Sequence, residues 1–565
     1  MMKRTRKLWM QMACVLCCLA FATSCSDDDL ANIDNDVVIP DFTEKSTMDI
    51  SEIEAGEIDS VSWHEHYSTI LGEAEQGNSE EDQMLAAFAK RSLEKNDSLI
   101  DAYLEQSGGN TEWGEGWDGK TGKNRLLGYK YVTIRYPSVD ATGQKIMLSE
   151  LVVFPYNSVL PNPHPDNLVI GCHVTITSNK ERPTNYDTNS FTTDVGMLAC
   201  HASSNSGSVE KEALVVIPDY EGYGVTQGNP HPYLYQSLTA RQVVDGAEAA
   251  VLWYEKTQKS MDDDWKAYSV GYSQGGSVAM AVHKHIQQSQ NSTLKSRFIG
   301  SVCGDGPYSP LATIKDYIST QKVYMPVAIG LILKGMCDVN PYMKGKFQME
   351  DFLTPGFMAS GIKQWIANKN YTTDDIQDKL RDYSRNSSDF TVMAQTKEGG
   401  YLPYKEANMT YEVNGKKVNR EWRDADKPMS CYCEIGEVLR PEVIQYFATG
   451  STTTEYATRC MALESALKMN DLTEGWTPSG AVIMFHSTKD EVVPFANYES
   501  AMRGFNGLDN VKGIRYVTAT FTHVSTGKSF YAWYESSYAA ALLNGGWKKY
   551  ANEYEETGIP GIHVW

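Results

Sequence analysis

The 565-residue sequence lacks several features that would place it in a narrow class of proteins. Beyond residue 25 it contains no apolar run long enough to span a bilayer. It lacks an excess of basic residues: 72 acidic against 51 basic side chains give a formal net charge of -21, which disfavours nucleic acid and polyanions as partners. It shows no internal repeat. What remains is a large folded chain with the composition of an enzyme.

The 11 cysteines do not form a metal-binding or redox pattern. Four lie in the first 25 residues, and the other seven are scattered too widely for a zinc site or a small disulfide scaffold. Cys431 and Cys433 are spaced too closely for either motif, so we expect them to be structural. His64 and His66 lack further ligands nearby, and we expect both at the surface. The sequence therefore predicts no metal and no organic cofactor.

The N-terminus has the pattern of an export signal, with a basic head and an apolar run within residues 3–22. The tetrapeptide 22–25, Ala-Thr-Ser-Cys, resembles a bacterial lipobox. This resemblance implies removal of residues 1–24 and attachment of lipid to Cys25. The acidic residues 26–29 resemble the tract that sends some lipoproteins to the outer face of the outer membrane. We expect a cell-surface protein held to the membrane through its anchor only, with the periplasmic face as the alternative.

The composition changes in steps along the rest of the chain. Residues 25–45 are acidic and predict a tether, and residues 46–126 are mixed and predict a helical extension. Strand and helix patterns alternate over 127–309 and return over 479–565. Between them, residues 310–478 are rich in aromatics and lack this alternation. The order predicts an α/β protein with helices on both faces of a mostly parallel sheet and a large inserted cap.

Individual elements can be placed within this outline. An opening hairpin is expected over 128–136 and 145–154, and buried strands are expected over 168–172, 213–217, 266–270, 298–302, 481–485 and 514–521. Helices are expected over 237–254, 277–288, 442–447, 461–469 and 529–543. Asn414 and Gly415 form a hairpin signal inside the cap.

Residues 271–276, Gly-Tyr-Ser-Gln-Gly-Gly, carry the strongest chemical signal. A Gly-x-Ser-x-Gly pattern alone arises by chance, but this one lies between a strand pattern and a helix pattern. A nucleophile elbow needs that context, because small neighbours permit the strained turn and the serine oxygen then lies at the positive end of the helix. We predict Ser273 as a nucleophile. An ordinary glycine-rich turn is the alternative.

A serine nucleophile needs a base and a carboxylate that orients it, in the chain order Ser, Asp, His for an α/β-hydrolase. Asp490 follows the strand expected at 481–485 and is predicted as the acid, with neighbouring Glu491 as its rival. His523 follows the next strand and is predicted as the base, with His486 and His563 less well placed. Carboxyl ends of parallel strands meet at one edge of a sheet, where these groups can converge.

These segments resemble the secretory lipase family of fungi and bacteria within the α/β-hydrolases. The resemblance covers about residues 128–545 and includes the elbow, the segments around Asp490 and His523, and three further motifs: Tyr136-Pro137-Ser138-Val139-Asp140 with Gly143, Pro218-Asp219-Tyr220-Glu221-Gly222-Tyr223-Gly224, and His231-Pro232-Tyr233-Leu234. It implies the α/β-hydrolase fold, a cap over an acyl pocket, and Ser273, Asp490 and His523 as nucleophile, acid and base.

The tetrahedral intermediate also needs hydrogen-bond donors for its oxyanion. One is expected to be the backbone N–H of Gln274. The second is expected from the loop after residues 168–172, where Val174 or Thr175 is the candidate because Val174 follows His173 in place of the common glycine.

The sequence therefore predicts a serine-dependent carboxylic ester hydrolase that forms an acyl-enzyme with a small-molecule or lipid ester. A polysaccharide acetyl or feruloyl esterase is the first alternative. A serine peptidase is the second, because Gly275 and Gly276 follow the serine as in prolyl oligopeptidase-like enzymes, although too few residues precede the core for their propeller. A non-catalytic surface binding protein is the third. Asp219 and Glu221 precede the nucleophile and are expected to be structural.

Overall fold

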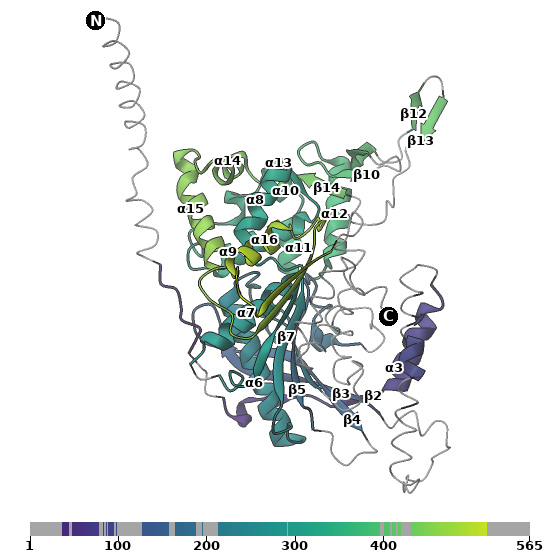
Figure 1. Ribbon diagram of the computed structural model, residues 1–565. Coiled ribbons are helices and arrows are strands. Elements are labelled where there is room, and N and C mark those ends of the chain that lie inside the picture. Colours follow the sequence, from purple (N-terminus) through teal and green to yellow (C-terminus); the bar gives the residue numbers. More distant parts are fainter. Residues whose placement is uncertain are drawn as a thin grey trace, which may run out of the picture.

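The structure is a computed structural model that describes residues 37–44, 48–77, 83, 86–87, 89–94, 98, 127–157, 164–187, 195, 213–290, 292–395, 400–406, 410–413, 416–419 and 431–516. In this part of the chain a large twisted sheet forms the lower half of the molecule, and a second group of helices stands above one edge of it (Figure 1). No helix among these residues is both long and apolar enough to cross a membrane.

The central sheet has the strand order β1-β3-β4-β6-β5-β7-β8-β15-β16, and β2 also pairs with β3. From β6 to β16 all neighbours are parallel, whereas β3, β4 and β6 pair antiparallel. The strands are β1 (Glu54–Ala55), β2 (Asp59–Ser62), β3 (Leu127–Val139), β4 (Lys145–Asn157), β5 (Asn167–Cys172), β6 (Ala213–Pro218), β7 (Lys266–Tyr272), β8 (Phe298–Gly304), β15 (Ala481–Ser487) and β16 (Val511–Tyr516). The predicted mostly parallel sheet and its opening hairpin are confirmed.

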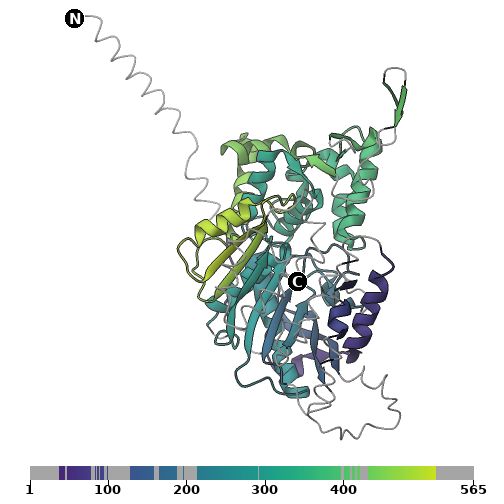
Figure 2. The ribbon, with the colours of Figure 1, turned by 45° about the vertical axis from the view of Figure 1, so that its right-hand side comes forward.

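Helices cover the sheet because its central strands are apolar on both faces, and every residue of β5, β6 and β15 is buried. Helix α6 (Gln236–Thr257) packs against β3, β4 and β6, and α7 (Gln274–Gln288) packs beside it against β5, β7 and β8. Helix α16 (Ala496–Gly504) packs against β15, and α3 (Trp63–Ala74) packs against β2 and β3. Figure 2 shows α3 on the far side of the sheet from α16.

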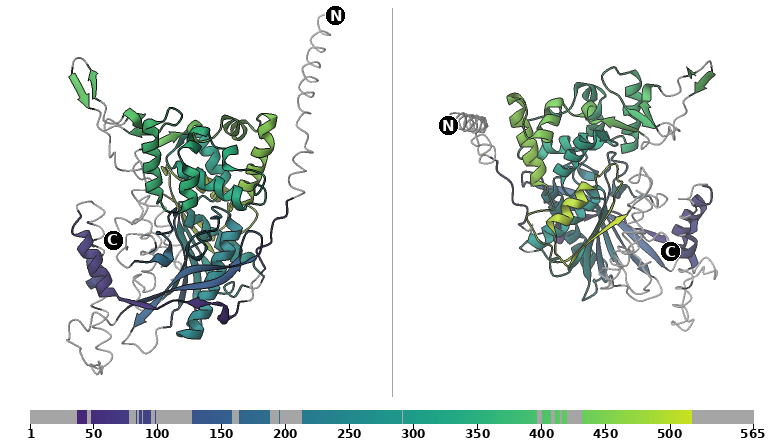
Figure 3. Two further views of the ribbon diagram at one scale, coloured as in Figure 1. Left: turned by 180° about the vertical axis from the view of Figure 1, so that it is seen from behind. Right: turned by 45° about the horizontal axis from the view of Figure 1, so that its top comes forward.

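The segment between β8 and β15 forms the cap. It has its own hydrophobic core, separate from the core at the sheet, and it stands above the sheet in both views of Figure 3. Its helices are α8 (Pro310–Thr320), α9 (Pro326–Val339), α10 (Pro355–Ala359), α11 (Ile362–Asn368), α12 (Thr373–Asn386), α13 (Ile435–Val438), α14 (Pro441–Thr449) and α15 (Thr454–Met469). Its small sheet has the order β11-β10-β14-β9, with β9 (Lys322–Val323), β10 (Met393–Gln395), β11 (Tyr401–Pro403) and β14 (Cys431–Glu434). The predicted hairpin is β12 (Thr410–Val413) and β13 (Lys416–Asn419).

The N-terminal segments differ from the predicted tether and helical extension. Phe42, expected in the tether, is buried against Tyr235, and its carbonyl accepts a hydrogen bond of 2.8 Å from Arg241. The extension contributes not only α3 but also β1 and β2, which pair with β3 at the edge of the sheet. The acidic composition of these segments predicted exposure to solvent. Instead, the ring of Phe42 holds the first segment against the core, and backbone pairing with β3 holds the second.

Two other expectations need correction. Strand β16 begins three residues before the predicted start at 514, because Lys512 and Gly513 make its first half look polar although it pairs along its length with β15. His66 is buried rather than exposed, since it shares the inner face of α3 with Trp63 and Tyr67, and burial lowers its pKa to about 4. The closing helix expected over 529–543 lies outside the described residues.

A carboxyl group lies inside the sheet core. Glu150 on β4 is fully buried, and among the described residues neither of its carboxylate oxygens has a hydrogen-bond partner. Burial, and then the charge of Asp219, raises the pKa of Glu150 well above its usual value. The folded chain therefore holds this proton more tightly than the unfolded chain does, and stability falls as the pH rises above the unfolded pKa.

We expect Glu150→Gln to stabilise the protein increasingly as the pH rises from 5 to 8, because glutamine carries no ionisable proton. Each pH unit below the folded pKa can contribute up to about 1.4 kcal/mol. Thermal unfolding across this range measures the difference in melting temperature between variant and wild type. Glu255→Gln, on an exposed part of α6, is the matched control. A difference that stays constant from pH 5 to 8 would show that Glu150 is not protonated in the folded state.

Candidate active site

Ser273 occupies a sharp turn between β7 and α7. Its backbone has φ 56° and ψ -124°, a region that residues other than glycine rarely enter. The neighbouring strand β8 holds this turn, because the N–H of Ser273 donates to the carbonyl of Gly304 at 2.9 Å. The serine is 7% exposed and stands at the N-terminus of a 15-residue helix. This is the strained strand-turn-helix geometry of a nucleophile elbow.

The two glycines after the serine are required by close backbone contacts. A Cβ atom on Gly275 would lie 1.9 Å from the carbonyl oxygen of Cys172, and one on Gly276 would lie 2.3 Å from that of Gly304. Helix α7 can therefore start directly against the ends of β5 and β8 only if both positions lack a side chain. The sequence motif is explained by packing at this point.

The predicted oxyanion donors lie on two segments beside the elbow. Gln274 is the first residue of α7, where helix amides have no acceptor within the helix. Val174 and Thr175 follow β5, whose Cys172 is paired with Gly271 of β7, so their loop leaves the sheet next to the elbow. The hydroxyls of Thr175 and Tyr233 are 2.8 Å apart. The loop is thus held by the segment between β6 and α6.

A buried histidine fixes the side chain of Gln274. The Nδ1–H of His231 donates to the carbonyl of Glu221 at 2.8 Å, and Nε2 of the ring lies 3.2 Å from the amide nitrogen of Gln274. Burial lowers the pKa of His231 to about 3, so its ring is neutral. Its Nε2 can therefore accept a hydrogen bond from the side-chain amide of Gln274. Tyr220 stacks between this ring and that of His173 at centroid distances of 6.2 and 4.1 Å. The stacked rings of His173, Tyr220 and His231 thus connect the loop that carries Val174 to the side chain of Gln274.

Asp490 lies in the turn that follows β15. One of its carboxylate oxygens accepts the backbone N–H groups of Val492 and Val493, both at 2.8 Å. Tyr317 on α8 of the cap donates its hydroxyl to the carbonyl of Val492. The carboxylate is therefore held in one orientation by its own turn, and a cap helix holds the turn. Glu491, the predicted rival, lies half-buried in the same turn.

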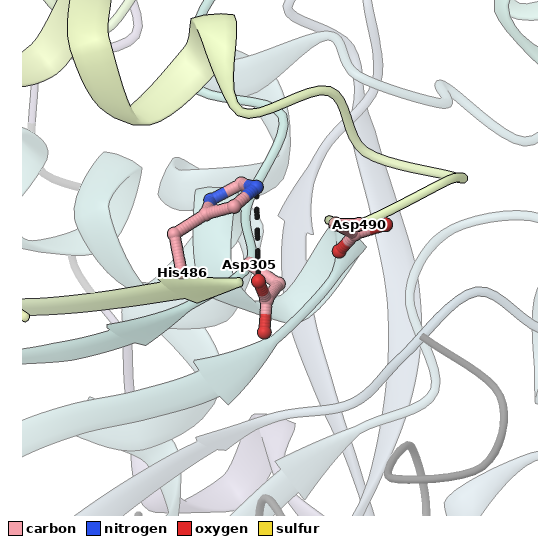
Figure 4. Close-up of side chains that lie close together, drawn as sticks. All are labelled: Asp305, His486 and Asp490. Atoms are coloured by element: carbon pink, nitrogen blue, oxygen red, sulfur yellow. Dashed lines mark ion pairs between the residues drawn. The ribbon is translucent and has the colours of Figure 1, made fainter. Parts of the chain in front are cut away.

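Sequence reasoning missed Asp305, which follows β8 and is fully buried with φ 38°. Its carboxylate accepts the N–H of Ser487 at 2.8 Å and lies 3.6 Å from Nε2 of His486. One ligand atom from each of Asp305, His486 and Asp490 lies within 4.8 Å of the others (Figure 4). The signal was present in the sequence, because an aspartate directly after a buried strand lies at the edge where Asp490 lies.

The three side chains act as a hydrogen-bonded support. The ring of His486 is fully buried, and its Nε2–H donates to the carbonyl of Val493 at 2.9 Å. Figure 4 shows the ring above Asp305, with Asp490 beside them on the turn. This arrangement gives His486 a structural position inside the protein. Two carboxylates and an imidazole are also ligand types that metals accept, but each already bonds the fold.

His523, the predicted base, and His563 lie outside the described residues. Tyr516, the last described residue of β16, pairs with Ser487 at the end of β15. In the sheet, β8 lies between β7 and β15, and β16 follows β15.

The carboxylates expected to be structural are bonded within loops. Asp219 accepts hydrogen bonds from the hydroxyl of Ser149 at 2.5 Å and from the N–H of Thr184 at 2.9 Å, while burial raises its pKa to about 6. Glu221 accepts from the side chains of Gln242 at 2.7 Å and of Asn229 at 3.0 Å. Both carboxylates hold the loops that follow β5 and β6.

The described cysteines are all buried: Cys172, Cys303, Cys337, Cys431, Cys433 and Cys460. Cys431 and Cys433 belong to β14, where they contribute to the core of the cap. Nδ1 of His66 lies 3.2 Å from the hydroxyl of Tyr129, in an aromatic cluster with Trp63. These contacts explain the residues as parts of the packing.

In sequence, the chain matches no family model and no curated protein. Among solved structures, it is similar to the rice cell wall degrading esterase LipA from Xanthomonas oryzae, with a TM-score of 0.52 and 16% identity over 79% of this chain and 96% of that chain. The ligand-bound form of LipA gives a TM-score of 0.52 and 16% identity over 80% of this chain and 95% of that chain. Candida antarctica lipase A in its closed state gives a TM-score of 0.43 and 14% identity over 74% and 78% of the two chains.

At these identities the likeness to LipA concerns the fold. Taken with the mixed sheet and the cap between β8 and β15, it shows that the chain has the α/β-hydrolase fold.

Proposed function

We propose that the chain is a serine-dependent carboxylic ester hydrolase. The observation that carries this proposal is the backbone of Ser273, which is held at φ 56° between a buried strand and the start of a helix. Strain of this kind is unfavourable by roughly 1–3 kcal/mol and is retained where it presents a side chain for chemistry. The α/β-hydrolase fold supports the same conclusion, because its nucleophile follows the strand that β7 represents.

In the proposed reaction, the oxygen of Ser273 attacks the carbonyl carbon of the ester, and His523 takes the hydroxyl proton. The oxyanion accepts a hydrogen bond from the N–H of Gln274 and a second from Val174 or Thr175. Collapse breaks the bond to the alcohol, which leaves with the proton from His523, and an acyl-enzyme remains. Water then attacks this ester by the same route and releases the acid.

Asp490 has the proposed role of orienting His523. The two backbone N–H groups that bond one oxygen of Asp490 fix the carboxylate and favour its ionised form. Asp305 and His486 brace the strand end on which this turn is built. The acid is thereby set on a rigid element, as a general base needs if its ring is to keep one tautomer.

The substrate class follows less directly from the fold. LipA is described as an esterase that degrades rice cell wall, which adds polysaccharide esters to the lipid and small acyl esters that the sequence suggests. The negative charge of the chain disfavours polyanionic substrates as a whole. We propose an uncharged or singly charged carboxylic ester, hydrolysed outside the cytoplasm by a protein anchored through Cys25.

We expect a fluorophosphonate probe to label the wild type at Ser273 and to leave Ser273→Ala unlabelled, because only an activated serine displaces the fluoride. Ester hydrolysis should fall by at least about three orders of magnitude in this variant. Ser277→Ala, four residues along α7, is the control for serine removal and should keep its labelling. Labelling that persists in Ser273→Ala would remove the proposed nucleophile.

Asp490→Asn should reduce kcat by up to about four orders of magnitude with little change in KM, because an amide at this position favours the wrong tautomer of the base. Steady-state kinetics with an activated ester measure both constants. Glu491→Gln, in the neighbouring position, should stay close to wild type. Low activity in Glu491→Gln with normal activity in Asp490→Asn would instead identify Glu491 as the acid. Loss of activity in Asp305→Asn without loss of stability would identify Asp305, which follows β8.

Cys25→Ala should release the protein from the membrane fraction, because the acyl chains supply the proposed membrane affinity. Fractionation of cells that express each form tests the anchor. Protease added to intact cells tests its side: surface exposure predicts loss of the wild-type protein. Survival of the protein under protease, with Cys25→Ala still released, would place the anchored chain on the periplasmic face.

A further inference from the structure

A small cavity lies where the loop after β6 meets two helices of the cap. Its volume is about 160 Å³, and an engineered cavity of about 150 Å³ is known to hold benzene. The core contributes Tyr223 and residues 228–231, and the cap contributes α9, α11 and Lys369, which follows α11. In Figure 1 these helices lie on the side of the cap that faces the sheet. The cavity can take one six-membered ring with a substituent.

The ammonium group of Lys369 lies in the wall of this cavity, although the residue is only 8% exposed. It donates to the carbonyl oxygens of Gln227 at 2.9 Å and Asn229 at 2.5 Å, and it lies 5.4 Å from the ring centroid of Tyr223. An ammonium has three N–H groups. Among the described residues, no carboxylate lies within ion-pair distance of Lys369, so the third N–H can serve a ligand.

Two lysines and one carboxylate line the cavity, and the charge of Glu221, outside this lining, also acts on Lys369. Lys334 on α9 also lines the cavity and pairs with Asp338 at 2.6 Å, so these two side chains balance each other. Burial, and then the charge of Lys334, lowers the pKa of Lys369 to about 8, which leaves it mostly protonated at pH 7. The chain as a whole is strongly acidic, with a net charge of -21. A local positive excess in such a chain favours a small anion.

The backbone of Lys369 is also unusual. It has φ 52° directly after a helix, a position where glycine is common because it has no strain there. Its carbonyl accepts the N–H of Asn179 at 2.8 Å, which ties it to the loop that begins with the predicted oxyanion residues. Lys369 thus has an unfavourable backbone conformation and a buried ammonium group. In this conformation its side chain lines the cavity.

One residue connects the cavity to the elbow. The ring of His231 lines the cavity, and its Nε2 accepts the side-chain amide of Gln274, the residue after the nucleophile. The side chains of His231 and Gln274 therefore lie between the cavity and Ser273.

We propose that this cavity binds a small organic carboxylate, with Lys369 and Lys334 as its cationic partners and a ring-sized body against Leu331 and Ile366. Sugar acids and aromatic acids share this chemistry. Binding of the carboxylate itself does not depend on catalysis.

Calorimetric titration of the full chain at pH 7 tests the proposal with two acids and their uncharged counterparts, D-glucuronate with glucose and benzoate with benzyl alcohol. We expect at least one acid to bind, with its counterpart at least about tenfold weaker, because a charged hydrogen bond is lost. Binding of glucuronate alone identifies a sugar acid, and binding of benzoate alone identifies an aromatic acid. The proposal is overturned if no acid binds or if acid and counterpart bind equally.

Charge-removing variants locate the binding. Lys369→Met and Lys334→Met should each weaken binding of the acid by about tenfold or more. Lys363→Met is the matched control, since Lys363 lies on α11, pairs with Glu350 and does not line the cavity. If Lys369→Met fails to fold, the binding measured with Lys334→Met tests the proposal alone. Lys334 does not make the hydrogen bonds to the loop after β6 that Lys369 makes.

Equal weakening in the control and in Lys334→Met would also overturn the proposal. Probe labelling of Ser273, measured on the same variants, separates this result from the proposed function. Lost binding with labelling retained supports the cavity, and retained binding without labelling contradicts the nucleophile alone.

Discussion

The close approach of helix α7 to the ends of β5 and β8 is the constraint on which the site depends. Backbone carbonyls of Cys172 and Gly304 occupy the space where side chains of Gly275 and Gly276 would stand. With the helix start fixed there, the chain must reverse within one residue, and Ser273 takes the strained conformation. The elbow, the start of α7 and its position next to the loop after β5 all follow from this contact.

The cap is coupled to the core at the loops that serve the proposed reaction. Tyr317 of the cap donates to the turn that carries Asp490, and the carbonyl of Lys369 accepts from Asn179 in the loop after β5. Each hydrogen bond joins residues more than 170 positions apart in the sequence. Removing the cap would therefore alter the acid and oxyanion segments as well as any pocket. The inserted cap therefore helps to position both loops.

Local patterns were sufficient to predict most of the sheet, because its central strands are apolar runs bounded by turn residues. The elbow was predictable for the same reason, since strand, glycines, serine and helix are contiguous around Ser273. The edge strands β1 and β2 were missed because they are short, polar and defined only by pairing with β3. Asp305 was missed because its importance comes from Ser487 and His486, which approach it from a strand more than 180 residues later.

Two buried basic residues near the elbow, His231 and Lys369, differ in charge because their surroundings differ. The sequence alone does not show this difference. His231 is neutral because burial depresses its pKa to about 3, and its Nε2 can then accept a hydrogen bond from the side-chain amide of Gln274. Lys369, in the same cavity wall, keeps its charge because two carbonyls and an aromatic face replace part of its hydration. A neutral ring therefore separates the cation from the helix start. The charge of Lys369 is directed toward the cavity.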